Sequence, residues 1–175
     1  MSGIVLYQSK YGAAKKYAEW ISEETGFGCI ELKKAGIKQT ADHDTLVLCG
    51  GIYASGISGL SFLKKNIGRL SGKKILVFCC GASPYDEGAF EQIRNHNMKE
   101  ALAEIPLFYG RGSFDMEAMS FTDRTLCGML RKAVAKKAPE DLEVWEKALM
   151  EAGGSKCDWT DRKYIEPVIG YIKTH

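Results

Sequence analysis

Residues 3–21 read GIVLYQSKYGAAKKYAEWI, and this stretch decides the fold because a strand pattern passes directly into a helix pattern. Residues 3–8 form a continuous apolar run, which is typical of a strand buried on both faces. The spacing of the later apolar residues predicts one face of an α-helix, formed by Ala14, Tyr17, Ala18 and Ile21. Two interpretations of the connecting loop are open: a compact turn in which Ser9 caps the helix, or a cradle for a negatively charged group.

The composition is that of one ordinary globular domain. The chain has 175 residues, of which 45% are hydrophobic and 26% are charged, and its net charge of +2 gives no reason to expect a nucleic-acid partner. No apolar stretch reaches the roughly 20 residues of a membrane span, and the first residues lack the pattern of a signal peptide. The six cysteines show no CxxC spacing and the three histidines are scattered. We therefore expect reduced thiols, no metal site and a cytoplasmic location.

Further apolar runs follow the first and are separated by helical patterns. They lie at residues 45–51, 74–81 and 105–112, with a weaker run at residues 28–32. Because strands alternate with helices, the sequence predicts an α/β fold, namely a doubly wound five-stranded parallel sheet with helices on both faces. Later helices are expected at residues 60–70, at residues 90–102 with a break near Asn95–Asn97, and before the C-terminus with Thr160 as N-cap and a bend at Pro167.

The segment of residues 113–159 interrupts this alternation. We treat it as an elaborated helical segment within a single domain that spans residues 1–175. Its predicted helix around Leu126–Val134 is rich in lysine and arginine. A basic face that touches an anionic membrane and a plain surface helix are both open, and the acidic residues that follow at once favour the plain surface helix.

Small residues follow each predicted strand. The loops read SKYGAA, GGIYASGISG, CGASPYDEG and GRGSFD in chain order. In doubly wound sheets, ligands bind beyond the carboxyl ends of the strands, where the strand order switches. The four loops therefore predict a ligand site at one edge of the sheet.

The order of these loops resembles the flavodoxin-like FMN domains over nearly the whole chain. The segments that carry this resemblance are SKYGAA, CGGIYASG and CCGASP, each placed directly after a strand. Two late segments, SFTDRTLCGMLRKAVAKK and GGSKCDWTDRKYIEPV, resemble the branch that contains the menaquinone-dependent protoporphyrinogen oxidases. The resemblance implies the strand order 2-1-3-4-5 and an FMN cofactor at the switch point.

The resemblance also assigns roles to particular residues. The family's phosphate loop, Ser/Thr-x-Thr-Gly-x-Thr, corresponds to Ser9, Lys10, Tyr11, Gly12, Ala13 and Ala14. At Tyr11 and Ala14 the family's hydroxyl residues are replaced, which removes or alters two hydrogen bonds of about 1 kcal/mol each. The flavin ring is expected between two walls, which are Gly50, Gly51, Ile52, Tyr53 and Ala54 on one side and Gly81, Ala82, Ser83, Pro84 and Tyr85 on the other. For Arg111, beside this position, two readings are open: contact with a reduced flavin or an anionic substrate, or a surface salt bridge.

Three functions stay open at this point. The first is an FMN-dependent oxidoreductase that acts on a small molecule or a quinone, with protoporphyrinogen oxidation as its specific form; chemistry carried by the cofactor needs no catalytic side chain. The second is an electron-transfer carrier that docks on a redox protein, although the charge of +2 differs from the acidic surfaces by which such carriers dock. The third is a flavin-free interaction domain, an alternative that the departure at Ala14 supports.

Overall fold

The computed structural model describes residues 2–175, and its centre is a parallel sheet of strand order β2-β1-β3-β5-β6. The strands are β1 (Gly3–Gln8), β2 (Gly28–Glu31), β3 (Thr45–Tyr53), β5 (Lys74–Gly81) and β6 (Leu107–Arg111). This order confirms the predicted doubly wound sheet, since counting only the parallel strands gives 2-1-3-4-5. Within this sheet, one strand was not predicted: β4 (Gly56–Ile57) folds back antiparallel onto the end of β3.

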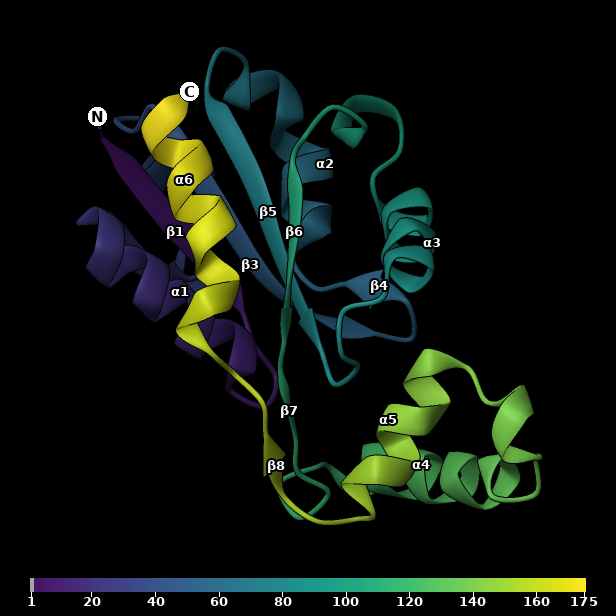
Figure 1. The fold of residues 1–175 in the computed structure, drawn as a ribbon. Helices are drawn as coiled ribbons and strands as arrows, with labels where there is room; N and C mark the ends of the chain where they lie inside the picture. The colour runs from purple at the N-terminus through teal and green to yellow at the C-terminus, as the bar shows by residue number, and fades with distance from the viewer. Residues whose placement is uncertain (1) are drawn as a thin grey trace.

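Helices cover both faces of this sheet (Figure 1). One face packs against α1 (Ala13–Thr25) and α6 (Glu166–Thr174), and the other packs against α2 (Leu60–Asn66) and α3 (Glu87–Asn97). Short 3₁₀ turns complete the layers, namely η1 (Leu32–Lys34), η2 (Ile37–Thr40), η3 (Ile67–Leu70), η4 (Glu100–Leu102) and η6 (Arg162–Ile165), and a further one, η5 (Pro139–Asp141), lies outside them, between α4 and α5. The alternating side chains of each central strand enter two different cores, which is why the apolar runs in the sequence are continuous.

Neither Ser9, the cap in one of the two open interpretations of the loop after β1, nor Thr160, the expected cap near the C-terminus, caps a helix. The N-cap of α1 is Gly12, at φ +101°, and Ser9 instead accepts a hydrogen bond from the Gly12 N–H at 3.0 Å. Near the C-terminus, Asp161 and not Thr160 caps η6. Pro167 lies in the first turn of α6, where its missing N–H costs no helical hydrogen bond, and not several residues into the helix as the predicted bend requires.

The hairpin between β3 and β4 is tied to the end of α3. Helix α3 ends at Asn97, near the break that the sequence predicts, and this side chain is buried. Its oxygen accepts a hydrogen bond from the Ile57 N–H at 2.9 Å, and its NH₂ group donates to the Ser55 carbonyl at 2.7 Å. The hairpin turn places both Ala54 (φ 44°) and Ser55 (φ 67°) in the left-handed region, which costs residues with a side chain roughly 1 kcal/mol or more each. The Asn97 bonds hold this strained turn in place.

The segment after β6 forms a helical arm, defined here as residues 115–156. It contains α4 (Phe121–Val134) and α5 (Val144–Ala152) and is joined to the sheet by a ribbon of β7 (Ser113–Phe114) and β8 (Cys157–Asp158). The arm extends from the carboxyl edge of the sheet, opposite the two chain termini (Figure 1). Its small core is separate from the two cores of the sheet. Among residues 2–175, no helix is both long enough and apolar enough to cross a membrane.

The close approach of the β4 hairpin to β3 predicts that Gly50→Ala destabilises the protein. A Cβ at residue 50 would lie 2.1 Å from the Ser58 carbonyl oxygen, and a backbone atom cannot move aside by changing rotamer. We expect a loss of about 1–3 kcal/mol in the free energy of unfolding, measured by urea denaturation. Gly68→Ala is the matched control, because a Cβ there meets nothing within 4 Å. Equal stability of the two variants would contradict the packing described here.

Candidate functional site

The loops that follow the parallel strands meet at one edge of the sheet. The strands end nearly level, because Gln8 is paired in register with Gly50, Gly51 with Cys80, and Gly81 with Arg111. The loop after β1, the β3–β4 hairpin, the loop after β5 and the end of β6 therefore emerge side by side, as the sequence predicts for a ligand site.

The loop after β1 presents backbone N–H groups at the start of α1. Gly12 turns the chain in the left-handed region, and the structure of residues 2–175 records no acceptor for the N–H groups of Ala13, Ala14 and Lys15. The first turn of α1 also lacks an acidic side chain that would complement the positive end of its dipole. Such a helix start is suited to hold an anion.

A cavity of about 230 Å³ opens in front of this helix start. Lys16 borders it and is bound to the Asp158 carboxylate at 2.9 Å and to the Thr160 hydroxyl at 2.8 Å. The complete lining is Tyr11, Gly12, Ala13, Lys16, Ser113, Asp115, Lys156, Cys157, Asp158 and Thr160. Two of these residues are cationic and two are anionic, so the lining as a whole is neutral.

A carboxylate from the arm binds the side chains of the same loop. Lys10 forms an ion pair with Asp123 of α4, and the Tyr11 hydroxyl donates to the same carboxylate. The hydrogen bond from Lys10, followed by that from Tyr11, lowers the pKa of Asp123, and the bond to Asp123 raises the pKa of Lys10. Sequence reasoning missed Asp123, since 113 residues separate it from Lys10 and no local pattern marks it.

The two predicted flavin walls approach each other through aliphatic and aromatic groups. A Cβ built on Gly81 would lie 3.5 Å from Ile52, so the end of β3 and the end of β5 are in contact range. Tyr53 projects toward Tyr11, with ring centroids 6.2 Å apart, and Lys10 lies 5.4 Å from the centre of the Tyr53 ring. Partial burial raises the pKa of Tyr53, so its hydroxyl stays protonated at neutral pH.

The loop after β5 is fixed by neighbours from β6. The Tyr109 hydroxyl donates to the Ser83 carbonyl at 2.5 Å, and the Arg111 Nε–H donates to the Ala82 carbonyl at 2.8 Å. Tyr85, at the exposed end of this loop, packs against the Tyr109 ring with centroids 6.2 Å apart. These bonds hold the wall formed by Gly81, Ala82 and Ser83 from behind.

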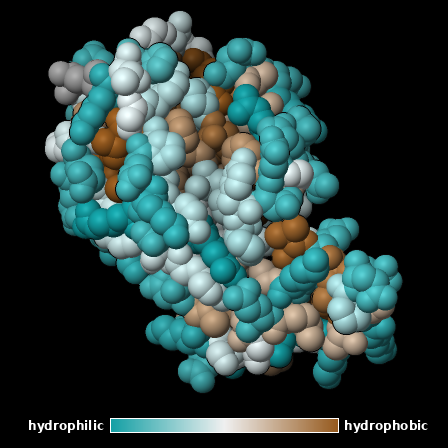
Figure 2. Space-filling view, in the orientation of Figure 1, coloured by the Kyte–Doolittle hydropathy of each residue, from teal (hydrophilic) through white to brown (hydrophobic). Residues whose placement is uncertain are grey.

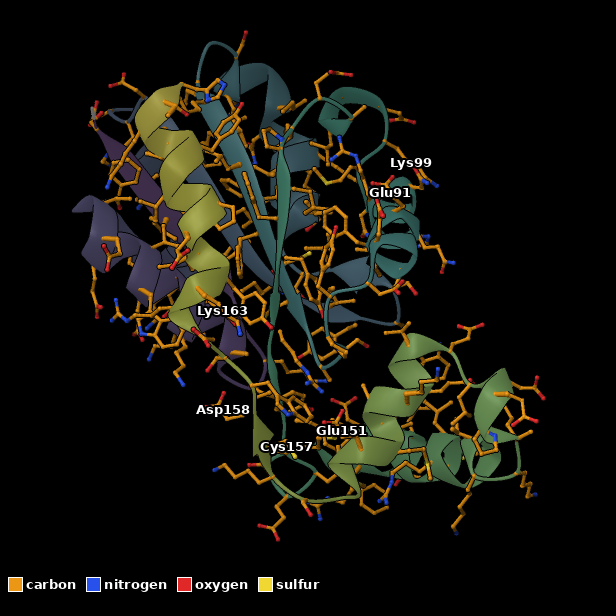
Figure 3. All side chains as sticks on the ribbon, in the orientation of Figure 1. Glu91, Lys99, Glu151, Cys157, Asp158 and Lys163 are labelled. Carbon is orange, nitrogen blue, oxygen red and sulfur yellow. The ribbon has the colours of Figure 1, made fainter. Side chains whose placement is uncertain are left out.

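Arg111 connects the sheet to the arm. Its guanidinium forms an ion pair with Glu151 at 3.0 Å and lies 3.9 Å from the ring centre of Trp159. In Figure 3, Glu151 of α5 lies beside Cys157 of the ribbon, at the junction of arm and sheet. Of the two readings left open for Arg111, the structure shows a salt bridge, although its side chain is only 13% exposed.

A second cavity, of about 560 Å³, lies on the other side of the loop, between the ends of β1 and β2 and helix α2. Its lining is Gln8, Ser9, Lys10, Glu31, Leu32, Lys33, Tyr53, Ser58, Ser61, Phe62, Lys65 and Asn66. Lys10, which pairs with Asp123, and Tyr53, whose ring lies beside Lys10, thus also border this cavity. The cavity carries more cations than anions, although Lys33 is already paired with Glu31 at 2.8 Å.

Other reactive groups do not form a second centre in the described part of the chain. No group of three or more His, Cys, Asp or Glu side chains in residues 2–175 is arranged to hold a metal ion. The adjacent thiols Cys79 and Cys80 are buried in opposite cores of the sheet. Burial raises the pKa of Cys80 to about 12, so its thiol is not a nucleophile at neutral pH.

Comparison with solved structures gives matches of low sequence identity. A short-chain flavodoxin associated with a non-canonical PDU bacterial microcompartment is 18% identical and matches 63% of this chain and 82% of its own, at a TM-score of 0.45. A WrbA-like flavodoxin from Agrobacterium tumefaciens is 16% identical, and the match covers 70% of this chain and 87% of that one at a TM-score of 0.46. A Fusobacterium nucleatum flavodoxin mutant bound to flavin mononucleotide is 12% identical, and the match covers 66% of this chain and 71% of that one at a TM-score of 0.40.

Two comparisons of the sequence itself give different results, and the match to a family model decides the family. No curated protein matches the chain significantly. A family model described as the flavodoxin domain matches residues 4–141, which includes all five parallel strands and α1 to α4. The chain therefore belongs to the flavodoxin domain family.

Proposed function

We propose that this protein binds FMN and acts as a flavodoxin-like redox protein. The observation that carries the proposal is the start of α1, where the N–H groups of Ala13, Ala14 and Lys15 have no recorded acceptor within residues 2–175. These groups lie at the sheet edge where the family to which the chain belongs is expected to hold the FMN phosphate.

The residues of the loop fit a phosphate through their backbone. Ala14 is 1% exposed and lies on the face of α1 that packs against the sheet. Position 14 therefore offers its backbone N–H and no hydroxyl. Ser9 holds the turn through Gly12, and Lys10 supplies a positive charge nearby. The Asp123 carboxylate opposes an anion, but it binds the side chains of Lys10 and Tyr11 and no backbone N–H of the loop.

The remaining residues would orient and shield the flavin ring. When bound, FMN supplies the capacity to accept and donate one or two electrons. Ile52 and Tyr53 on one side, and the Gly81–Ser83 wall on the other, would position the ring and exclude water from part of it. The Tyr53 hydroxyl, whose pKa is raised by burial, stays neutral and adds no charge next to the ring.

In a finer form of the proposal, the protein is an FMN-dependent oxidoreductase with a quinone or small-molecule acceptor, similar to a protoporphyrinogen oxidase. The net charge of +2 supports this form over an electron carrier, because carriers dock through acidic surfaces. The late segments of the sequence that resemble the oxidase branch form α4 and the start of α6, both connected to the site edge. A carrier and a flavin-free interaction domain are the alternatives.

The two glycines that cap α1 give a matched test of FMN binding. Gly12 and Gly26 both have positive φ, and a Cβ at either position meets nothing within 4 Å. Gly12→Ala and Gly26→Ala should therefore lose similar stability from left-handed strain, about 1 kcal/mol each. Only Gly12→Ala should weaken FMN binding, by about tenfold or more, because it displaces the N–H groups that face the phosphate.

Quenching of flavin fluorescence measures this binding, with riboflavin as the ligand that lacks a phosphate. We expect FMN to bind the wild-type protein at least tenfold more tightly than riboflavin. Equal affinities for FMN and riboflavin would refute the phosphate site. A protein that stays colourless after incubation with FMN would leave the flavin-free interaction domain as the function.

The ion pair beneath the loop predicts a change in the titration of Asp123. Since Lys10 is the main cause that holds the pKa of Asp123 below its ordinary value of 3.8, Lys10→Met should raise this pKa. Because the folded-state pKa of Asp123 is lowered, the pair stabilises the folded position of the arm at every pH above the unfolded-state pKa of this carboxyl group. The stabilisation is lost as the pH falls through the folded-state pKa, which lies below 3.8. NMR titration of the carboxyl carbon measures the shift. Lys15→Met is the control, since Lys15 pairs with Glu19, and an Asp123 pKa that responds equally to both variants would contradict the contact.

Enzyme and carrier are separated by direct assay of the flavin-loaded protein. With protoporphyrinogen as donor and menadione as acceptor, the oxidase form predicts turnover above the uncatalysed rate. Turnover at the uncatalysed rate, with FMN still bound, would eliminate this form and leave the carrier.

A further inference from the structure

Helix α4 exposes an apolar stripe to solvent. Leu126 is 55% exposed, Met129 is 64% exposed and Leu130 is 37% exposed, and Phe121 at the start of the helix is 85% exposed. The helix buries Val134 and half-buries Cys127 against α5, so its packed face is already occupied. The stripe of Leu126, Met129 and Leu130 is therefore not the core face of α4. Figure 2 shows that the arm also carries apolar, brown surface on the side where α5 faces the viewer, so apolar exposure on the arm extends beyond the stripe.

The same helix and the turn after it carry a cluster of cations, which ends at the acidic residues Glu140, Asp141 and Glu143. Residues 124–139 contain no acidic residue, and their cations are Arg124, Arg131, Lys132, Lys136 and Lys137. Only Lys137 forms an ion pair among the residues that the structure describes, with Glu146 at 2.6 Å. Arg124 donates to the carbonyls of Met116 and Glu117, which satisfies its N–H groups without neutralising its charge.

The combination identifies the kind of surface that would cover the stripe. A second copy of the chain would place two sets of these cations against each other, and a few side chains bury far less than the roughly 800 Å² per partner of a stable interface. An anionic lipid surface satisfies both features, because its headgroups attract the cations while the interface accepts apolar side chains to a shallow depth. We propose that α4 docks the protein onto an anionic membrane surface.

Docking through α4 would bring the candidate site to the lipid. The Asp123 carboxylate lies on α4 and binds Lys10 and Tyr11 of the loop after β1. The arm as a whole extends from the edge of the sheet where the loops of the site emerge (Figure 1). A lipid-soluble reactant would then reach this edge without crossing water. The docking itself rests on α4 alone and does not depend on the FMN proposal.

Co-sedimentation with lipid vesicles tests the proposal on the full chain. We expect binding to vesicles of phosphatidylcholine with 30% phosphatidylserine, weak binding to phosphatidylcholine alone, and weaker binding as salt increases. The double variant Lys132→Gln/Lys136→Gln should bind anionic vesicles roughly 30-fold less tightly, from the typical gain per lysine at such a surface. Lys99→Gln/Lys173→Gln removes the same charge at the end of the sheet opposite the arm and should bind like the wild type.

The apolar contribution is tested by Leu126→Ser/Met129→Ser, with Met150→Ser on α5 as the control for loss of another exposed apolar side chain. Both variants should keep the wild-type urea midpoint, and only the first should lose vesicle binding. Equal binding to both vesicle types, or no binding to either, would overturn the proposal. A dimer in solution that the first variant dissociates, without vesicle binding, would assign the stripe to a second copy instead.

Discussion

Burial of both faces of the sheet is the constraint from which the rest of the structure follows. In β1, Ile4 packs into one core and its neighbour Val5 into the other, and β3 and β5 repeat this alternation. A polar side chain within a central strand would therefore be buried, at a cost in free energy unless it finds a hydrogen-bond partner. Polar chemistry is confined to the strand ends, and the register of the parallel strands brings their carboxyl ends to one edge. Packing alone thus fixes where a site can lie, before any residue of the site is considered.

At this edge, the arm and the candidate anion site divide the loop after β1 between them. Asp123 takes the side chains of Lys10 and Tyr11, while the N–H groups at the start of α1 point to the other side and keep no partner within residues 2–175. This division gives a physical meaning to Tyr11, where the family has a hydroxyl residue for the phosphate. The Tyr11 hydroxyl lies farther from its own backbone than a threonine hydroxyl, and it reaches α4 instead.

The sequence was sufficient for features that depend on neighbours along the chain. The bounds of β1 and β5 agree with the apolar runs, because a strand buried on both faces ends where the run ends. Near the C-terminus, Thr160 and Asp161 are both good caps by residue type, and tertiary contacts choose between them: Lys16 and Asp158 engage the Thr160 hydroxyl, which leaves Asp161 to cap. Asp123 was beyond prediction for the same reason, since its partners lie more than 100 residues away.

The arm differs from the sheet in what holds it. Its own core is small, and its recorded links to the sheet include the Asp123 cluster and the contacts of Arg111 with Glu151 and Trp159. Charge pairs near the surface weaken with salt and with neighbouring charges, whereas burial of apolar area in the sheet does not. The position of the arm at the strand edge therefore depends on charge contacts as well as on the β7–β8 ribbon and the packing of Ala82 and Phe114, while the edge itself is set by the packing of the sheet. A change in these charge contacts acts on the arm without a cost in the two cores of the sheet.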